Sequence, residues 1–136
     1  MIQPNNLKRV RPSTRRDGRD RHLGVSSENT LKNNTATNNG EHGFLLVESD
    51  RNVLRENSAS LNAVVGFLLV ESTDNVLVEN RARKNAYGFA AVVESFGNLV
   101  KENRFCQNSV FDVFDPESSF NTYIENKICG DTVLDE

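Results

Sequence analysis

Acidic side chains recur at a fixed interval along this 136-residue chain and are the first candidates for chemistry. The two rows are Glu48, Glu71, Glu94 and Glu117, and Glu56, Glu79, Glu102 and Glu125. Stacked carboxylates of this kind could hold Ca²⁺, which prefers clustered oxygen ligands. They could also form a solvated face on which nearby Arg and Lys side chains relieve the repulsion. We favour the second interpretation and predict neither a metal site nor a cofactor.

The two cysteines, Cys106 and Cys129, are separated by the same interval of 23 residues. If this interval is one coil of a stacked structure, their Cα atoms lie about 4.8 Å apart. A disulfide can bridge that distance. We expect both side chains to face outward. A disulfide in an oxidising compartment and a pair of free thiols both fit the spacing.

Asparagine shows the interval most clearly and indicates which architecture positions these groups. Two rows are Asn29, Asn52, Asn75, Asn98 and Asn121, and Asn34, Asn57, Asn80, Asn103 and Asn126, with a third row of Asn39, Asn62, Asn85 and Asn108. A fixed period of this size indicates stacked repeats. Asparagine suits the corners because its amide can bond to the amides above and below it. It also tolerates the left-handed backbone that we expect at a corner.

Each repeat contains three short runs of strand-forming residues, separated by residues that favour turns. In one repeat the runs are 44–47, 53–55 and 58–60. No repeat has an apolar pattern at helical spacing. The sequence therefore predicts an all-β fold, a right-handed single-stranded parallel β-helix of about five 23-residue coils with three strands per coil. This domain is predicted to span residues 25–136.

Three positions stay apolar in every repeat and identify the predicted interior. The stacks are Leu31, Leu54, Leu77, Val100 and Tyr123; Ala36, Ala59, Ala82, Phe105 and Ile128; and Phe44, Phe67, Phe89 and Val113. The third coil departs from the pattern, because one residue fewer separates Asn85 from Gly88 than separates Asn62 from Gly66. An extra residue within 89–93 restores the register, which predicts a local bulge there.

The first strand of each coil has apolar residues at its outward positions as well. These are Leu45, Leu68 and Ala90, and then Val47, Val70 and Val93. Only the fourth coil offers acids on this face, Asp112 and Asp115, and no basic residue shares their strand. That arrangement argues against lyase chemistry. A contiguous exposed apolar patch usually marks a partner contact, so we expect self-association or a protein partner here.

Along each repeat an Asn is followed by an aliphatic residue, then by an Asn corner, and then by Gly-Phe before the next strand. This pattern resembles the pectate-lyase-like superfamily and, within it, the β-helix repeats of NosD-type periplasmic copper accessory proteins. The resemblance covers residues 28–130 and implies a secreted or cell-surface setting and, in many relatives, a carbohydrate partner. Copper sites draw on His, Met and Cys. This chain offers only Met1, His22, His42, Cys106 and Cys129, a set too scattered to predict a copper site.

The N-terminal segment differs from the rest in charge. Residues 1–24 carry seven basic and two acidic side chains, whereas the whole chain has a net charge of −3. Because the segment lacks apolar periodicity, we expect a disordered arm, with a nucleic-acid tether as the less favoured alternative. It is not built like a secretory signal, and no later segment could span a membrane.

Neither this arm nor residues 131–136 would cap the apolar end of a solenoid. The chain is therefore predicted to be a fragment of a longer β-helix or to stack end to end. We expect a non-catalytic β-helix scaffold or binding module of a secreted or cell-surface protein, with no catalytic residues. The alternative is a polysaccharide-active, lyase-like or epimerase-like domain, or a fragment of one.

Overall fold

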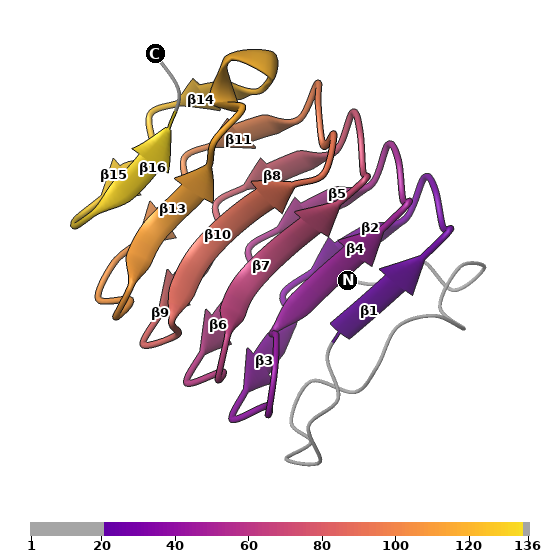
Figure 1. Ribbon diagram of the computed structural model, residues 1–136. Coiled ribbons are helices and arrows are strands. Elements are labelled where there is room, and N and C mark those ends of the chain that lie inside the picture. The colour runs from indigo at the N-terminus through magenta and orange to yellow at the C-terminus, as the bar shows by residue number, and fades with distance from the viewer. Residues whose placement is uncertain (1–20, 135–136) are drawn as a thin grey trace.

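The computed structural model describes residues 21–134, which form a β-solenoid (Figure 1). Sheet A consists, in spatial order, of β1 (Arg21–Gly24), β4 (Phe44–Val47), β7 (Val65–Val70), β10 (Tyr87–Val92), β13 (Phe111–Asp115) and β16 (Thr132–Leu134). Sheet B consists of β2 (Thr30–Lys32), β5 (Val53–Arg55), β8 (Val76–Val78), β11 (Leu99–Lys101) and β14 (Thr122–Ile124). Sheet C consists of β3 (Thr35–Thr37), β6 (Ser58–Ser60), β9 (Arg81–Arg83), β12 (Arg104–Phe105) and β15 (Lys127–Ile128).

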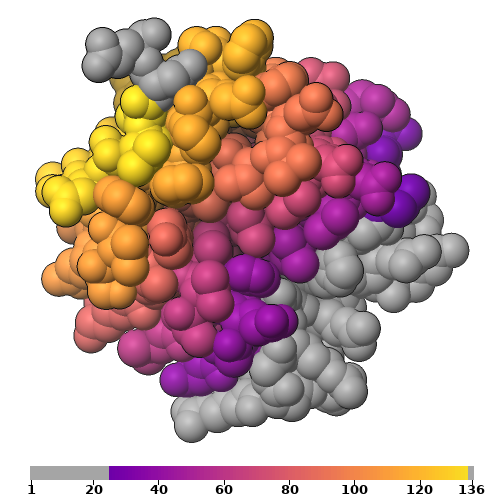
Figure 2. All heavy atoms as spheres, in the orientation of Figure 1, coloured from indigo at the N-terminus to yellow at the C-terminus, as the bar shows by residue number. Residues whose placement is uncertain are grey.

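Each strand pairs in parallel with its counterparts on the neighbouring coils, so every sheet runs along the solenoid. The predicted β-helix with three strands per coil is therefore confirmed. In the space-filling view the coils follow one another in sequence order, from indigo to yellow (Figure 2). The only helical segment among the described residues is a 3₁₀ turn, η2 (Ser118–Phe120), between β13 and β14.

The sheet begins four residues before the predicted domain boundary at residue 25. Arg21–Gly24 form β1, which pairs with β4 and extends sheet A by one strand. Residues 1–20, which make up the rest of the predicted disordered arm, lie outside the described residues.

The interior contains the three apolar stacks that the sequence predicts. Successive members of a stack lie side by side on neighbouring coils of the same sheet, as in Leu31 with Leu54 and Phe44 with Phe67. The rings of Phe44 and Phe67 are parallel within 4°, with their centroids 4.8 Å apart. Fully burying a side chain of this size stabilises the fold by about 1.5–3 kcal/mol. Tyr123 and Ile128 are partly buried and pack against the end of this core.

The predicted bulge in the third coil is present, and the structure identifies its extra residue as Val93. The Glu71 backbone N–H lies 3.4 Å from the Val92 oxygen and 3.0 Å from the Val93 oxygen. Val93 has a φ of 52° and follows the end of β10. The partner of Val70 in the ladder is therefore Val92, and the expectation that Val93 occupies this outward row is wrong.

Left-handed backbone occurs at the corners, but the ladder asparagines do not adopt it. The residue before the asparagine does so at every corner except that of Asn121, as in Glu56, Glu79 and Glu102, with φ of 56°, 57° and 55°. A left-handed conformation costs a non-glycine residue about 1–2 kcal/mol. At such a corner the chain turns at the strained residue, and the following Asn points its amide inward.

Candidate functional site

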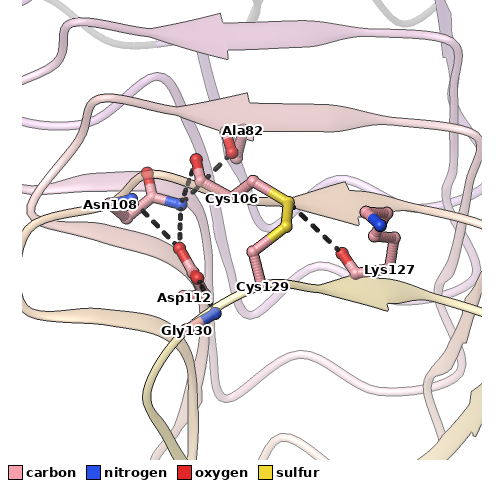
Figure 3. Close-up of a disulfide and its surroundings, with 7 residues drawn as sticks. All are labelled: Ala82, Cys106, Asn108, Asp112, Lys127, Cys129 and Gly130. Carbon is pink, nitrogen blue, oxygen red and sulfur yellow. Dashed lines mark hydrogen bonds between the residues drawn. A yellow bond between two sulfur atoms is a disulfide. The ribbon is translucent and has the colours of Figure 1, made fainter.

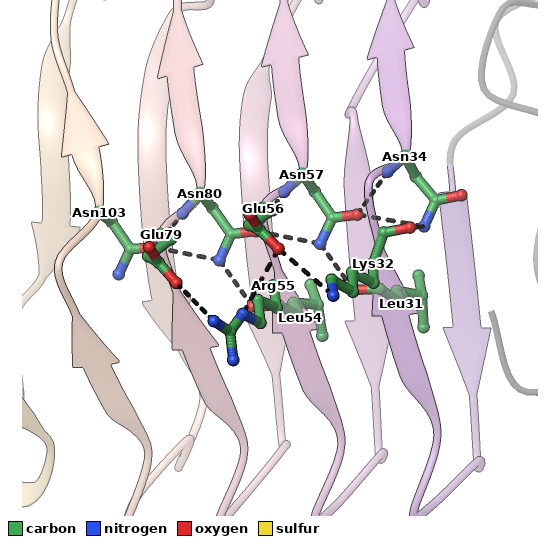
Figure 4. A network of polar contacts seen from close by, with 10 residues as sticks. All are labelled: Leu31, Lys32, Asn34, Leu54, Arg55, Glu56, Asn57, Glu79, Asn80 and Asn103. Atoms are coloured by element: carbon green, nitrogen blue, oxygen red, sulfur yellow. Dashed lines mark hydrogen bonds and ion pairs between the residues drawn. The ribbon is translucent and has the colours of Figure 1, made fainter. Parts of the chain in front are cut away.

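The corner asparagines form continuous ladders of buried hydrogen bonds (Figure 4). The backbone N–H and the Nδ2 of Asn57 donate to Oδ1 of Asn80, at 2.9 and 3.0 Å. Its Nδ2 also donates to the Leu31 carbonyl at 2.9 Å. Asn80 repeats the pattern with Asn103 and with the Leu54 carbonyl. Because these buried amides have partners on both sides, the role of the ladder is structural.

A further ladder, which the sequence analysis missed, consists of serines at the end of sheet A. The backbone N–H of Ser49 donates to Oγ of Ser72 at 3.1 Å, and that of Ser72 donates to Oγ of Ser95 at 3.1 Å. All three serines are buried. The signal was available in the sequence, because each serine follows a glutamate of the first acidic row.

Asp112 and Asp115 point inward, which corrects their predicted place on the outer face. Oδ1 of Asp112 accepts from the N–H and the Nδ2 of Asn108, at 3.0 and 2.7 Å. Its Oδ2 accepts from the Gly130 N–H (Figure 3). Oδ2 of Asp115 accepts from Nδ2 of Asn121 at 2.9 Å and from the Tyr123 hydroxyl at 2.6 Å. These carboxylates receive the last rungs of two Asn ladders.

Glycines precede the inward phenylalanines of sheet A because a side chain there would collide with the corner. A Cβ on Gly66 would lie 2.7 Å from the Gly88 carbonyl oxygen and 2.9 Å from Nδ2 of Asn85. In the fourth coil the corresponding position is Asp112, the residue before Val113. This change from Gly to Asp explains why the carboxylate turns into the corner and does not lie on the outer face.

Cys106 and Cys129 form a disulfide that joins β12 to the coil containing β15 (Figure 3). Their Cα atoms are 4.9 Å apart, close to the separation expected for adjacent coils. Cys129 is exposed and Cys106 is 5% exposed, and both side chains line a depression on the outer side of sheet C beside Arg81 and Arg104. The bond therefore connects two coils next to the buried Phe105.

The glutamates of the second row lie at the corner that follows sheet B, and they pair with cations carried by the strands of sheet B. Oε1 of Glu56 lies 3.7 Å from Nζ of Lys32 and 3.5 Å from Nε of Arg55 (Figure 4). Arg55 also contacts Glu79 at 3.1 Å. These side chains are 41–51% exposed, so each pair contributes at most about 1 kcal/mol.

The outer face of sheet A carries apolar side chains over four consecutive strands. We call it the apolar face and define it as Leu45, Val47, Leu68, Val70, Tyr87, Ala90, Val92, Phe111 and Phe114. Leu45, Leu68, Ala90 and Phe114 are successive partners in the ladder and form one row across it. The face contains no charged side chain.

Ala90 creates a depression in the apolar face because its neighbours in the row are Leu68 and Phe114. The depression has a volume of about 210 Å³, and its lining also includes Tyr87, Val92 and His42. The Tyr87 and Phe114 rings meet edge to face with their centroids 5.8 Å apart. This aromatic contact holds one wall of the depression in place.

No helix among residues 21–134 is long and apolar enough to cross a membrane. Within the same part of the chain, no three His, Cys, Asp or Glu side chains converge as metal ligands.

The protein-family model for NosD, described as a periplasmic copper-binding protein, matches residues 13–134. Neither the curated proteins nor the solved structures contain a match to the chain. Copper prefers thiolate, thioether and imidazole ligands. Both thiols here are consumed by the disulfide, and His42 lies apart from them on the edge of the apolar face. The described side chains do not fit a copper centre.

The family match extends over most of the chain, and each sequence repeat forms one coil of the solenoid. The chain therefore belongs to the NosD family of parallel β-helix proteins.

Proposed function

We propose that this chain is a non-catalytic β-helix scaffold that docks a protein through the apolar face of sheet A. The observation that carries the proposal is the run of uncharged, partly exposed side chains over β4, β7, β10 and β13, with the buried Ala90 among them. Monomeric proteins rarely leave such a patch contiguous unless it meets a partner. The setting is periplasmic or extracellular. The periplasmic description of the family and the Cys106–Cys129 disulfide both support it.

The positions of the acids favour docking over the alternative of a polysaccharide-active domain. Glycoside chemistry on this face would require carboxylates directed outward, usually as an acid and base pair. The two acids of β13, Asp112 and Asp115, are instead 2% and 1% exposed and bond to corner groups. The outward positions beside them hold Phe111 and Phe114.

The partner that this face fits is a second copy of the same chain. A two-fold interface must be self-complementary, and this face carries both a depression over Ala90 and projecting side chains such as Leu45. Two such faces can pack as stacked sheets at the usual separation of about 10 Å. Nine residues are fewer than the roughly 20–30 per side of a standard interface, so we expect weak association.

Sedimentation equilibrium over a wide range of protein concentration tests the proposal. We expect the wild-type chain to dimerise, and Leu68→Lys to weaken the dimer by at least about tenfold because a charge would be buried without a partner. Thr122→Lys is the matched control, since Thr122 is exposed on sheet B. A wild-type chain that stays monomeric, or equal weakening by both variants, would contradict docking by a second copy. Release of unsaturated uronate from a polyuronate would contradict the non-catalytic assignment.

A further inference from the structure

The outer face of sheet C changes character along the solenoid. In β3 and β6 its outward residues are hydroxylic: Thr35, Thr37, Ser58 and Ser60. In β9, β12 and β15 they are cationic, namely Arg81, Arg83, Arg104 and Lys127. All four cations are exposed. A chain with a net charge of −3 therefore concentrates positive charge on one face of its last three coils.

These cations are stacked on one another. Arg104 is the ladder partner of Arg81 on one side and of Lys127 on the other. Arg83 lies two residues after Arg81 on the same strand and shares its outward direction. Like charges directly opposite each other in a sheet destabilise it. The arrangement therefore opposes folding unless something compensates the charge.

In the described part of the chain no carboxylate forms an ion pair with these arginines, although Glu56 and Glu79 lie beside Arg81. Glu56 and Glu79 pair with Lys32 and Arg55, on the sheet B side of the corner, and Glu102 pairs there with Lys101. The ion pairs within residues 21–134 involve none of Arg81, Arg83 and Arg104. The glutamates that precede β9 and β12 therefore form their ion pairs with cations of sheet B and not with the arginines that follow them.

The arginines border a concave site. A depression of about 570 Å³ is lined by Arg81, Arg83, Arg104 and Gln107, and the two cysteines of the disulfide also line it. The disulfide ties the coil of Arg104 to the next coil. The strand that carries the central guanidinium is therefore held in place before any ligand arrives.

We propose that this depression binds a phosphate-bearing ligand through Arg81, Arg83 and Arg104. A guanidinium presents a planar fork of N–H groups that matches phosphate oxygens. One fork already satisfies the two oxygens of a carboxylate. Three forks suit a tetrahedral phosphate, which offers more acceptor oxygens and up to two negative charges. The site lies on sheet C and is separate from the docking function proposed for sheet A.

Titration calorimetry on the full chain at low ionic strength tests the site. The probes are inorganic phosphate, phosphatidylglycerol vesicles and, as a zwitterionic surface without net charge, phosphatidylcholine vesicles. We expect Arg104→Gln to weaken binding by roughly tenfold or more, in line with the strength of hydrogen bonds between charged groups. Arg51→Gln removes the same charge from an exposed corner outside sheet C and should change binding by less than about twofold.

Each outcome decides the proposal. Binding of inorganic phosphate identifies a soluble ligand, whereas binding to phosphatidylglycerol vesicles alone identifies a lipid headgroup. Binding of neither probe, or equal weakening by Arg51→Gln, overturns the proposal. Arg83→Gln is the second variant should Arg104→Gln disturb folding, which circular dichroism would detect. Because Arg83 is exposed and contacts the same depression, it should show the same loss of affinity.

Discussion

The outer faces of sheets A and C are built on the same coils yet differ in chemistry. Sheet A presents apolar rows from β4 to β13, whereas sheet C changes from hydroxyl groups to cations between β6 and β9. Behind both faces lie the same inward stacks, and the same Asn corners join them. The corners and the interior therefore provide the stability of the solenoid, so the outward residues of each sheet are free to differ in chemistry.

Disrupting one of the shared Asn corners should destabilise the coils that carry both outer faces, and this is the largest effect we expect. Asn80→Ala removes the acceptor of the Asn57 N–H and Nδ2 and the donor to the Leu54 carbonyl. Each buried group left unsatisfied costs roughly 1–3 kcal/mol, so the free energy of unfolding should fall by about 3 kcal/mol or more. Urea denaturation measures it.

Thr35→Ala provides the control for that experiment, because Thr35 is exposed on sheet C and should change stability by less than about 0.5 kcal/mol. An Asn80→Ala chain as stable as this control would show that the ladder does not support the coils.

Removing the disulfide should separate the two faces. A bridge closing a loop of this length stabilises a protein by about 3 kcal/mol in the chain-entropy account. The double variant Cys106→Ala, Cys129→Ala should therefore lower the unfolding free energy by up to that amount. It should weaken phosphate binding on sheet C, which the bond adjoins, and leave dimerisation through sheet A within about twofold.

Wild-type protein in reductant should reproduce the effect of the double variant, measured by the same calorimetry and sedimentation. If dimerisation fell along with phosphate binding, the two faces would not be independent.

The interior and the coil count could be predicted from the sequence because the same residue type returns at the same place. Leu31, Leu54 and Leu77 meet in register, and the residue missing after Asn85 is restored at Val93. The periodic signal fails where a residue changes its partner. Asp112 occupies a glycine position and bends into the corner, a contact that the spacing of the chain does not encode.

The candidate surfaces were predicted less completely for a related reason. Alternation along β4 and β7 identifies the outward Leu and Val rows, but the shape of the surface that they form depends on the side chains of neighbouring coils. The depression over Ala90 exists only because Phe114 and Leu68 flank it. The cationic depression of sheet C likewise depends on which cations the glutamates pair with, and that is decided by side-chain geometry at the corners.

Filling the depression of sheet A should alter one face alone. Ala90→Leu restores the residue type of Leu45 and Leu68 in the same outward row, so stability should change by less than about 1 kcal/mol. If the dimer inserts a side chain over Ala90, its dissociation constant should rise by about fivefold, the effect of roughly 1 kcal/mol. Sedimentation equilibrium measures the change, and unchanged phosphate binding serves as the control. Unaltered dimerisation would place the contact elsewhere on the face.

The smallest effect should come from replacing a left-handed corner residue. We expect this replacement to change stability slightly and to leave binding at both outer faces unchanged. Leu61 has a φ of 57° and is 50% exposed, so its left-handed backbone is strained while its side chain contributes little packing. Leu61→Gly removes about 1–2 kcal/mol of strain but adds up to about 1 kcal/mol of unfolded-chain entropy. A net stabilisation of about 0.5 kcal/mol should follow, measured by urea denaturation. Leu61→Ala keeps the strain and should show no gain. If glycine instead destabilised the chain, the Leu61 side chain would contribute packing, and the separation of corners from faces would be less complete than the ladders indicate.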